Sequence, residues 1–190
     1  MRYSKTHKDE TRLKLLNSSR AITKKGGFSV TSVDTLMSAV GMTGGAFYNH
    51  FPSKQALFQA VIEEEVQNSR EMLAGDENSS DDHVIKWLRK YLSVSHALHP
   101  DDGCVLPTLG PEIARSGPEV RSAVEAAVTG IQKAWSARTS DGDAAWAVIA
   151  QCIGALALAR MVESEATREE ILQANLRVIE KHHLHTPDDQ

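Results

Sequence analysis

The chain has 190 residues, 41% hydrophobic and 24% charged, which suits a globular protein with a core, either as one domain or as a small head on a larger body. Two cysteines, Cys104 and Cys152, are too few for a disulfide framework, and no secretory signal opens the chain. The sequence therefore predicts a protein of the reducing cytoplasm. The net charge of −4 alone suggests no polyanionic partner.

The charges, however, are distributed unevenly along the chain. Residues 1–55 carry nine Lys or Arg and three acidic residues, whereas the remainder carries twelve basic and twenty-two acidic residues. A basic head on an acidic body is expected when only the head meets a polyanion, although terminal charges can also serve solubility alone. The segment before Thr11 is expected to be a mobile basic arm.

Helical spacing dominates the sequence, and no stretch shows the sustained alternation of a strand, so the predicted fold class is all-α. The head should hold a first helix that ends at Gly26 and Gly27 and a second that ends at Gly41. A third helix should begin at Thr43. The expected later helices cover 53–73, 83–98, 105–115, 118–139, 143–162 and 167–183, with a polar loop at 74–82 and a frayed tail from 185.

The apolar stretch 144–162 is at the short end for a membrane span, and it contains Gln151 and Arg160. We interpret it as a buried helix of the body and expect no membrane partner. This helix is apolar on nearly all its faces, so more than one face must pack against another helix. Its small residues Ala147, Ala150 and Gly154 permit close approach of such a helix. A second copy of the chain, paired through the helices near 143–162 and 167–183, would supply that packing, with complete burial inside a monomer as the alternative.

The two short helices around Gly41 suit a helix-turn-helix, in which the second helix enters the DNA major groove. Neither is long enough to be stable alone, so both must pack on the first helix through residues such as Val33, Leu36 and Phe47. Helix N-termini can meet phosphates, glycines permit close backbone approach, and Asn49 has the donor and acceptor pair that suits a base edge. The candidate DNA-binding residues are Thr31, Ser32, Thr43, Gly44, Gly45, Tyr48, Asn49, His50 and Lys54.

The segment GFSVTSVDTLMSAVGMTGGAFYNHFPSKQALF, from Gly27 to Phe58, resembles the TetR family of bacterial repressors, with a glycine, a short helix, a turn and an FYxHFxSKxxL pattern. Thr23 and Met37 depart from the family pattern, at positions where a bulky apolar residue and a small Ala are usual. The resemblance implies a DNA-binding domain at 1–52, an effector-binding and dimerisation domain at 53–190, and a homodimer on a pseudo-palindromic operator in double-stranded DNA.

The resemblance also implies a pocket for a small-molecule effector among the middle helices, whose binding releases the repressor from DNA. Activators use the same kind of head, so activation is the alternative to repression. No cofactor is expected. The candidate lining residues, each of which could equally be ordinary core, are Met72, Trp87, Tyr91, Cys104, Leu109, Ile113 and Trp135.

Cys104 is expected to be an inert, partly buried cysteine, and two alternatives stand beside that interpretation. It follows HPDDG at an expected loop-to-helix junction, where an exposed thiol could sense electrophiles or oxidants, as in some regulators of this branch, although Asp101 and Asp102 would oppose the thiolate. With His96 or His99 as base it could instead serve a small all-α thiol enzyme, but no catalytic signature supports that class. His96, His99 and Cys104, like the histidines at 182, 183 and 185, lack strong ligand spacing, so no metal site is predicted.

Overall fold

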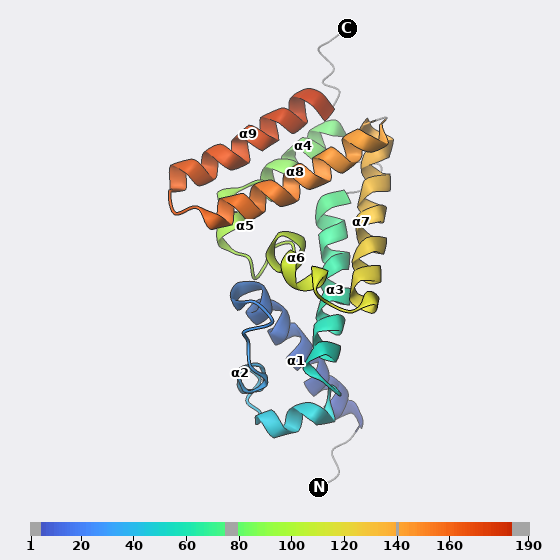
Figure 1. Cartoon of the computed structure of the whole chain (residues 1–190), viewed down its shortest axis with the longest axis vertical. Coiled ribbons are helices and arrows are strands. Elements are labelled where there is room, and N and C mark those ends of the chain that lie inside the picture. The colour runs from blue at the N-terminus through green and yellow to red at the C-terminus, as the bar shows by residue number, and fades with distance from the viewer. Residues whose placement is uncertain (1–4, 75–79, 140, 184–190) are drawn as a thin grey trace.

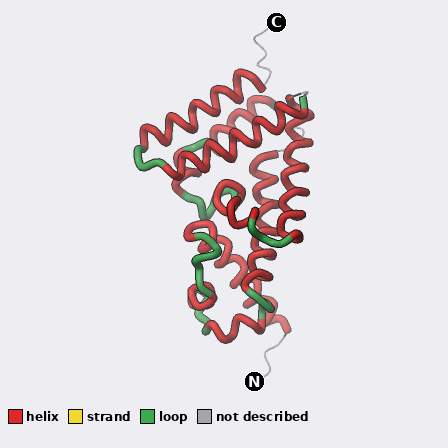
Figure 2. The backbone as a smooth tube through the Cα atoms, in the orientation of Figure 1, coloured by secondary structure: helices red, strands yellow, loops and turns green. Residues whose placement is uncertain are grey.

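The computed structural model describes residues 5–74, 80–139 and 141–183, and in these ranges the chain forms helices and loops without strands (Figures 1 and 2). The predicted all-α class is confirmed for these ranges. The elements are α1 (Lys5–Gly26), α2 (Val33–Ser38), the 3-10 helix η1 (Gly44–Asn49), α3 (Lys54–Ala74), α4 (Asp81–Tyr91), α5 (Val94–Leu98), α6 (Leu106–Ala114), α7 (Pro118–Thr139), α8 (Gly142–Met161) and α9 (Glu165–His183). Most of the predicted loop at 74–82 and the tail from 185 lie outside the described residues.

The head lies at one end of the molecule and contains α1, α2, η1 and the beginning of α3 (Figure 1). Gly27 has a φ of +85° and Gly41 a φ of +72°, so both turns use the left-handed backbone that glycine adopts without strain. The head core consists of Leu15, Leu16, Leu36, Met37, Phe47, Phe51, Leu57 and Val61. Thr23, which departs from the TetR pattern, is buried and donates its hydroxyl to the Ser19 carbonyl at 2.7 Å.

Helix α3 belongs to both halves of the molecule. Leu57 and Val61 pack in the head core, whereas Phe58, Ile62 and Val66 pack in the body core. Ser53, the first residue of the helix predicted over 53–73, caps α3 by accepting a hydrogen bond from the Ala56 amide at 3.1 Å. The same helix therefore carries two apolar faces, and the two cores cannot move independently of it.

The body packs α7 against α3 and α8, and α8 against α9 (Figure 1). Helix α8 is long and apolar enough to span a membrane by length and composition alone, but 39% of its apolar window is buried inside the fold. Leu156 and Cys152 are among its buried residues.

Two expectations for the helices are wrong, and the structure defines the type of a third helix. The helix predicted over 83–98 is two helices, because Leu92 leaves the helical conformation and Ser93 caps α5 by accepting from the His96 amide. The predicted third helix of the head is present and is the short 3-10 helix η1, with Thr43 at its N-cap. The arm before Thr11 is already helical from Lys5 onward, and its first four residues lie outside the described ranges.

Candidate DNA interface and effector cavity

The outer face of the head presents several of the predicted DNA-binding residues to solvent. Tyr48 is 67% exposed, and Asn49 beside it in η1 is also exposed. Ser32 lies at the N-terminus of α2 and accepts a hydrogen bond from the Thr35 amide at 3.0 Å. The sequence from Thr31 to Asp34 resembles a capping box that begins at Thr31, but in the structure the cap is Ser32.

Thr31 and Lys54, two further predicted residues, also have partners within the head. Thr31 is buried, and its hydroxyl donates to the Gly27 carbonyl at 2.6 Å. The Lys54 ammonium donates to the Ser29 carbonyl at 3.1 Å and lies 4.6 Å from the centre of the Phe28 ring. Thr31 and Lys54 therefore shape the turn between α1 and α2, whatever else they contact.

The start of η1 is crowded at one glycine and open at the next. A Cβ atom on Gly44 would lie 1.8 Å from Oδ1 of Asp34, whereas a Cβ on Gly45 would meet nothing within 4 Å. Thr43 stands at the N-cap position, where the sequence predicts the third helix to begin, but its side chain makes no capping hydrogen bond. Packing inside the head therefore requires glycine at position 44, whereas it does not require glycine at position 45.

Arg12 also belongs to the head surface around η1, although the sequence pattern does not indicate it. Its Nη1 donates to the His50 carbonyl at 2.8 Å, and its guanidinium lies 3.9 Å from the centre of the Phe51 ring. The residue joins α1 to the end of η1, which fixes the position of the short helix on the head. Only the three-dimensional arrangement shows this, since the two segments are 38 residues apart.

A cavity of about 570 Å³ lies in the body beside the loop between α5 and α6. The rings of Trp87 and Tyr91 stack with centroids 5.9 Å apart, and His96 meets Tyr91 edge-on at 4.7 Å. The lining residues are Met72, Trp87, Lys90, Tyr91, Ser93, Ser95, His96, His99 and Asp102. An aromatic wall with a polar rim of this size suits a small organic molecule.

Only part of the predicted lining borders this cavity. Met72, Trp87 and Tyr91 do, whereas Leu109, Ile113 and Trp135 belong to the buried core of the body. The indole of Trp135 donates to the Leu73 carbonyl at 2.6 Å, which is a structural contact. Helical spacing cannot separate the two groups, because core and cavity walls use the same apolar residues.

Cys104 is 1% exposed, which agrees with an inert, buried cysteine and not with the exposed thiol that the sensor alternative requires. Burial raises the pKa of its thiol, and the Ser69 hydroxyl, 3.2 Å from Sγ, only partly opposes this rise. Burial likewise raises the pKa of Cys152 to about 12. Both thiols are therefore protonated near neutral pH, the less reactive form.

Both ring nitrogens of His96 are engaged by the backbone. Nδ1 donates to the Tyr91 carbonyl at 2.7 Å, and Nε2 accepts from the Cys104 amide at 3.0 Å. Burial lowers the pKa of His96, as do the charges of Arg160 and Lys24, against the opposing hydrogen bond to Tyr91. A neutral imidazole with these two hydrogen bonds has a structural role, since it links the backbone at Tyr91 to the backbone at Cys104. It is not placed as a base for the Cys104 thiol or as a metal ligand.

Comparison with known proteins identifies the family. Residues 15–61 match the profile described as bacterial regulatory proteins, tetR family. The HTH-type transcriptional repressor Rv1474c of Mycobacterium tuberculosis is 31% identical over 134 residues, 66% of each chain. The solved TetR transcriptional regulator from Chloroflexus aurantiacus superposes with a TM-score of 0.71 at 25% identity, covering 93% of this chain and 98% of the other.

This chain belongs to the TetR family. The HTH-type transcriptional regulator UidR of Escherichia coli is 37% identical over 57 residues, but the match spans only 29% of its length. The resemblance to that relative thus covers 30% of this chain.

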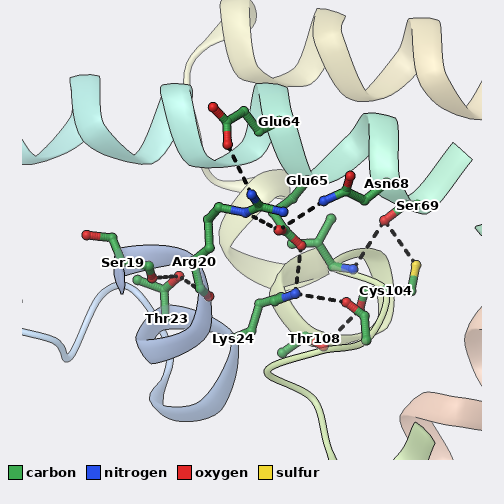
Figure 3. Close-up of polar contacts among 12 residues, drawn as sticks. Ser19, Arg20, Thr23, Lys24, Glu64, Glu65, Asn68, Ser69, Cys104 and Thr108 are labelled. Carbon is green, nitrogen blue, oxygen red and sulfur yellow. Dashed lines mark hydrogen bonds and ion pairs between the residues drawn. The ribbon is translucent and has the colours of Figure 1, made fainter. Parts of the chain in front are cut away.

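In this TetR-family chain, a buried ionic network joins head and body (Figure 3). Lys24, from the last turn of α1, lies 2.8 Å from Oε2 of Glu65 and donates to the Gly103 carbonyl at 3.0 Å. Arg20 pairs with Oε1 of the same Glu65. Lys24 and Glu65 are 6% and 1% exposed, so the charges satisfy each other out of water.

A second contact reaches the head from α6. The Glu112 carboxylate accepts hydrogen bonds from the amides of Phe28 at 2.9 Å and Ser29 at 3.0 Å. The Phe28 side chain also joins head and body, because its ring packs in the body core with its centroid 4.4 Å from that of the Phe58 ring. No local sequence pattern points to Lys24, Glu65 and Glu112, because Lys24 and Glu65 are 41 residues apart, and Phe28 and Glu112 are 84 residues apart.

Proposed function

We propose that this TetR-family protein is a DNA-binding transcriptional regulator, a repressor, whose head reads operator DNA through η1. The single observation that carries the proposal is the exposed pair Tyr48 and Asn49 on a helix whose other face is locked into the head core by Phe47. Asn49 would contact a base edge, while Tyr48 and the amides at the N-terminus of α2 would contact phosphates. Its working compartment would be the cytoplasm, where the DNA is.

The aromatic cavity is the candidate effector site. Its volume of about 570 Å³ and its Trp87 and Tyr91 wall favour a planar, mostly apolar compound. A ligand that binds better to the DNA-free conformation would release the operator by shifting the population of conformations. Sensing through Cys104 is not part of the proposal, since its thiol is buried and held protonated.

The proposed functional unit is a homodimer formed through α8 and α9. Trp146, Leu158 and Met161 of α8 are 45%, 54% and 78% exposed, and Val178 of α9 is 40% exposed. Together with the exposed Ala147 and Ala150, the α8 residues follow helical spacing along one side of the helix. An uncovered apolar stripe of this length is typical of an interaction surface, and a second copy would bring two heads to successive major grooves.

The test is a binding titration of the purified protein against DNA that flanks its own coding region, at two salt concentrations and with unrelated competitor DNA. We expect binding that weakens with salt, because phosphate contacts release counterions, yet resists competitor. Binding no tighter than to competitor places the operator elsewhere in the genome, which a genome-wide selection of bound fragments would locate. Absence of binding even at low salt would refute the proposed function.

A further inference from the structure

The loop from His99 to Gly103 separates two cavities. On one side lies the aromatic cavity, which His99 and Asp102 help to line. On the other lies a smaller polar cavity of about 210 Å³, bordered by Lys24, Glu65, Asp101 and Gly103. Met72 and Asp102 border both cavities, so a change in one cavity acts on a wall of the other.

The loop is tightly seated on the aromatic side. The Cys104 amide donates to Nε2 of His96, and a Cβ atom on Gly103 would lie 2.5 Å from that same nitrogen. His96 in turn contacts the Tyr91 ring of the cavity wall. Tyr91, His96 and Gly103 are packed without a gap between them. A ligand that displaces the Tyr91 wall of the cavity therefore also displaces the loop that contains Gly103.

The opposite side of the loop holds the head. The Gly103 carbonyl accepts a hydrogen bond from the Lys24 ammonium, which also pairs with the buried Glu65 carboxylate. Ser69, one turn beyond Glu65 on α3, contacts both the Cys104 thiol and the Val105 amide, which fixes where the loop ends (Figure 3). Movement of the Gly103 carbonyl therefore removes a partner from a buried cation in the last turn of α1.

From these contacts we infer that the loop from His99 to Gly103 couples occupancy of the aromatic cavity to the docking of α1, with Lys24 as the connecting residue. This inference rests on the proposed function, since it assigns the regulation of the proposed effector site. An occupied cavity withdraws the Gly103 carbonyl, loosens the end of α1 and frees the turn that carries Phe28 and Ser29. Binding at the cavity and head docking then oppose each other, as reciprocal linkage requires.

The experiment measures hydrogen exchange of the backbone amides in 24–31, without DNA, in the presence and absence of N-phenyl-1-naphthylamine. This neutral aromatic probe reports its own binding by fluorescence, and Trp87→Ala should weaken that binding if the probe occupies the cavity. In the unmodified protein, the probe should raise exchange in 24–31 about fivefold or more, the lower range of typical allosteric coupling.

Lys24→Met should raise exchange in 24–31 before any probe is added, and the probe should then add no further increase. Lys25→Met is the matched control, since Lys25 is the exposed neighbour on the same helix and should respond like the unmodified protein. If Lys24→Met leaves Glu65 unpaired and the protein does not fold, the double variant Lys24→Met/Glu65→Gln removes both buried charges and makes the same measurement possible.

Three results would overturn the inference: an equal response to the probe in the Lys24 variants and the unmodified protein, no change in 24–31 when the cavity is occupied, or no binding of the probe to the cavity. Each is distinct from failure of the proposed function, because exchange is measured without DNA. A protein that shows the coupling but never binds DNA would refute only the proposed function.

Discussion

At the scale of single residues, His96 makes the loop sensitive to acid. The pKa of His96 lies below its ordinary value of 6.5, with burial as the largest cause and Arg160 and Lys24 adding to it. The unfolded chain therefore binds a proton on this residue at a higher pH than the folded chain does. Stability from His96 is complete above about pH 6.5 and is lost as the pH falls toward the folded pKa. Protonation of Nε2 would also set two donors, the ring N–H and the Cys104 amide, against each other.

We expect the midpoint of urea unfolding to decrease between pH 7.5 and pH 5.5, and we expect His96→Gln to reduce this decrease. Glutamine keeps a carbonyl that can accept from the Cys104 amide but has no group that titrates in this range. The exposed His83→Gln serves as the control, and its pH dependence should match that of the unmodified protein. Identical pH dependence in all three proteins would show that protonation of His96 is not coupled to unfolding.

A substitution at Gly45 should change DNA binding and protein stability in opposite directions, so the two effects can be measured separately. Nothing lies within 4 Å of a Cβ at this position, and its φ is not positive, so Gly45→Ala should stabilise the head by about 0.4–1 kcal/mol through the unfolded chain. If the backbone here approaches the duplex, operator affinity should nevertheless fall. Thermal unfolding and a DNA titration of the same preparation check both parts, and unchanged affinity would exclude close approach at Gly45.

At the scale of helices and loops, the sequence predicts most elements but not the reason each one ends. Gly27 and Gly41 are readable because a left-handed turn almost requires glycine, and Pro118 marks the start of α7. The break between α4 and α5 was missed because Ser93 interrupts a continuous helical pattern without Gly or Pro. The cavity wall was predicted only in part, since spacing reports which residues are apolar and not which of them remain beside empty space.

Glu112 of α6 is expected to stabilise the turn between α1 and α2. Its carboxylate accepts from the amides of Phe28 and Ser29, and the Ser29 carbonyl accepts in turn from Lys54. Glu112→Gln replaces one acceptor oxygen by a donor that faces an amide, which should cost about 1.5–3 kcal/mol, the range for a hydrogen bond to a charged group. A urea titration with unchanged slope measures this cost.

The exposed Glu125→Gln on α7 provides the control for the Glu112 variant and should stay within about 0.5 kcal/mol of the unmodified protein. Equal stabilities of the Glu112 and Glu125 variants would show that the two amide bonds contribute nothing to the docking of the head.

At the scale of the whole molecule, head and body are separate cores joined by shared parts. The charge asymmetry and the helix-turn-helix pattern predict two units, but a boundary at 52 and 53 does not describe how they connect. Phe28 of the head packs in the body core, and Leu57 of the first body helix packs in the head core. Such crossed packing depends on which faces meet in space, and neither residue carries a local signal for it. The joined cores are what would let a change in the body reach the head.

The exposed stripe on α8 gives the final prediction. Replacing Leu158 and Met161 together by Glu should place two charges in the proposed interface, where their desolvation opposes association. Sedimentation at micromolar concentration should show a dimer for the unmodified protein and a monomer for this variant. Leu13→Glu, at a 55% exposed leucine of α1, introduces a charge outside the stripe and should leave the dimer intact. The monomer should lose affinity for a full operator but keep its weak affinity for a half-site, since each head binds one major groove. A monomeric unmodified protein, or a dimer that tolerates both charges, would show that α8 is not the interface.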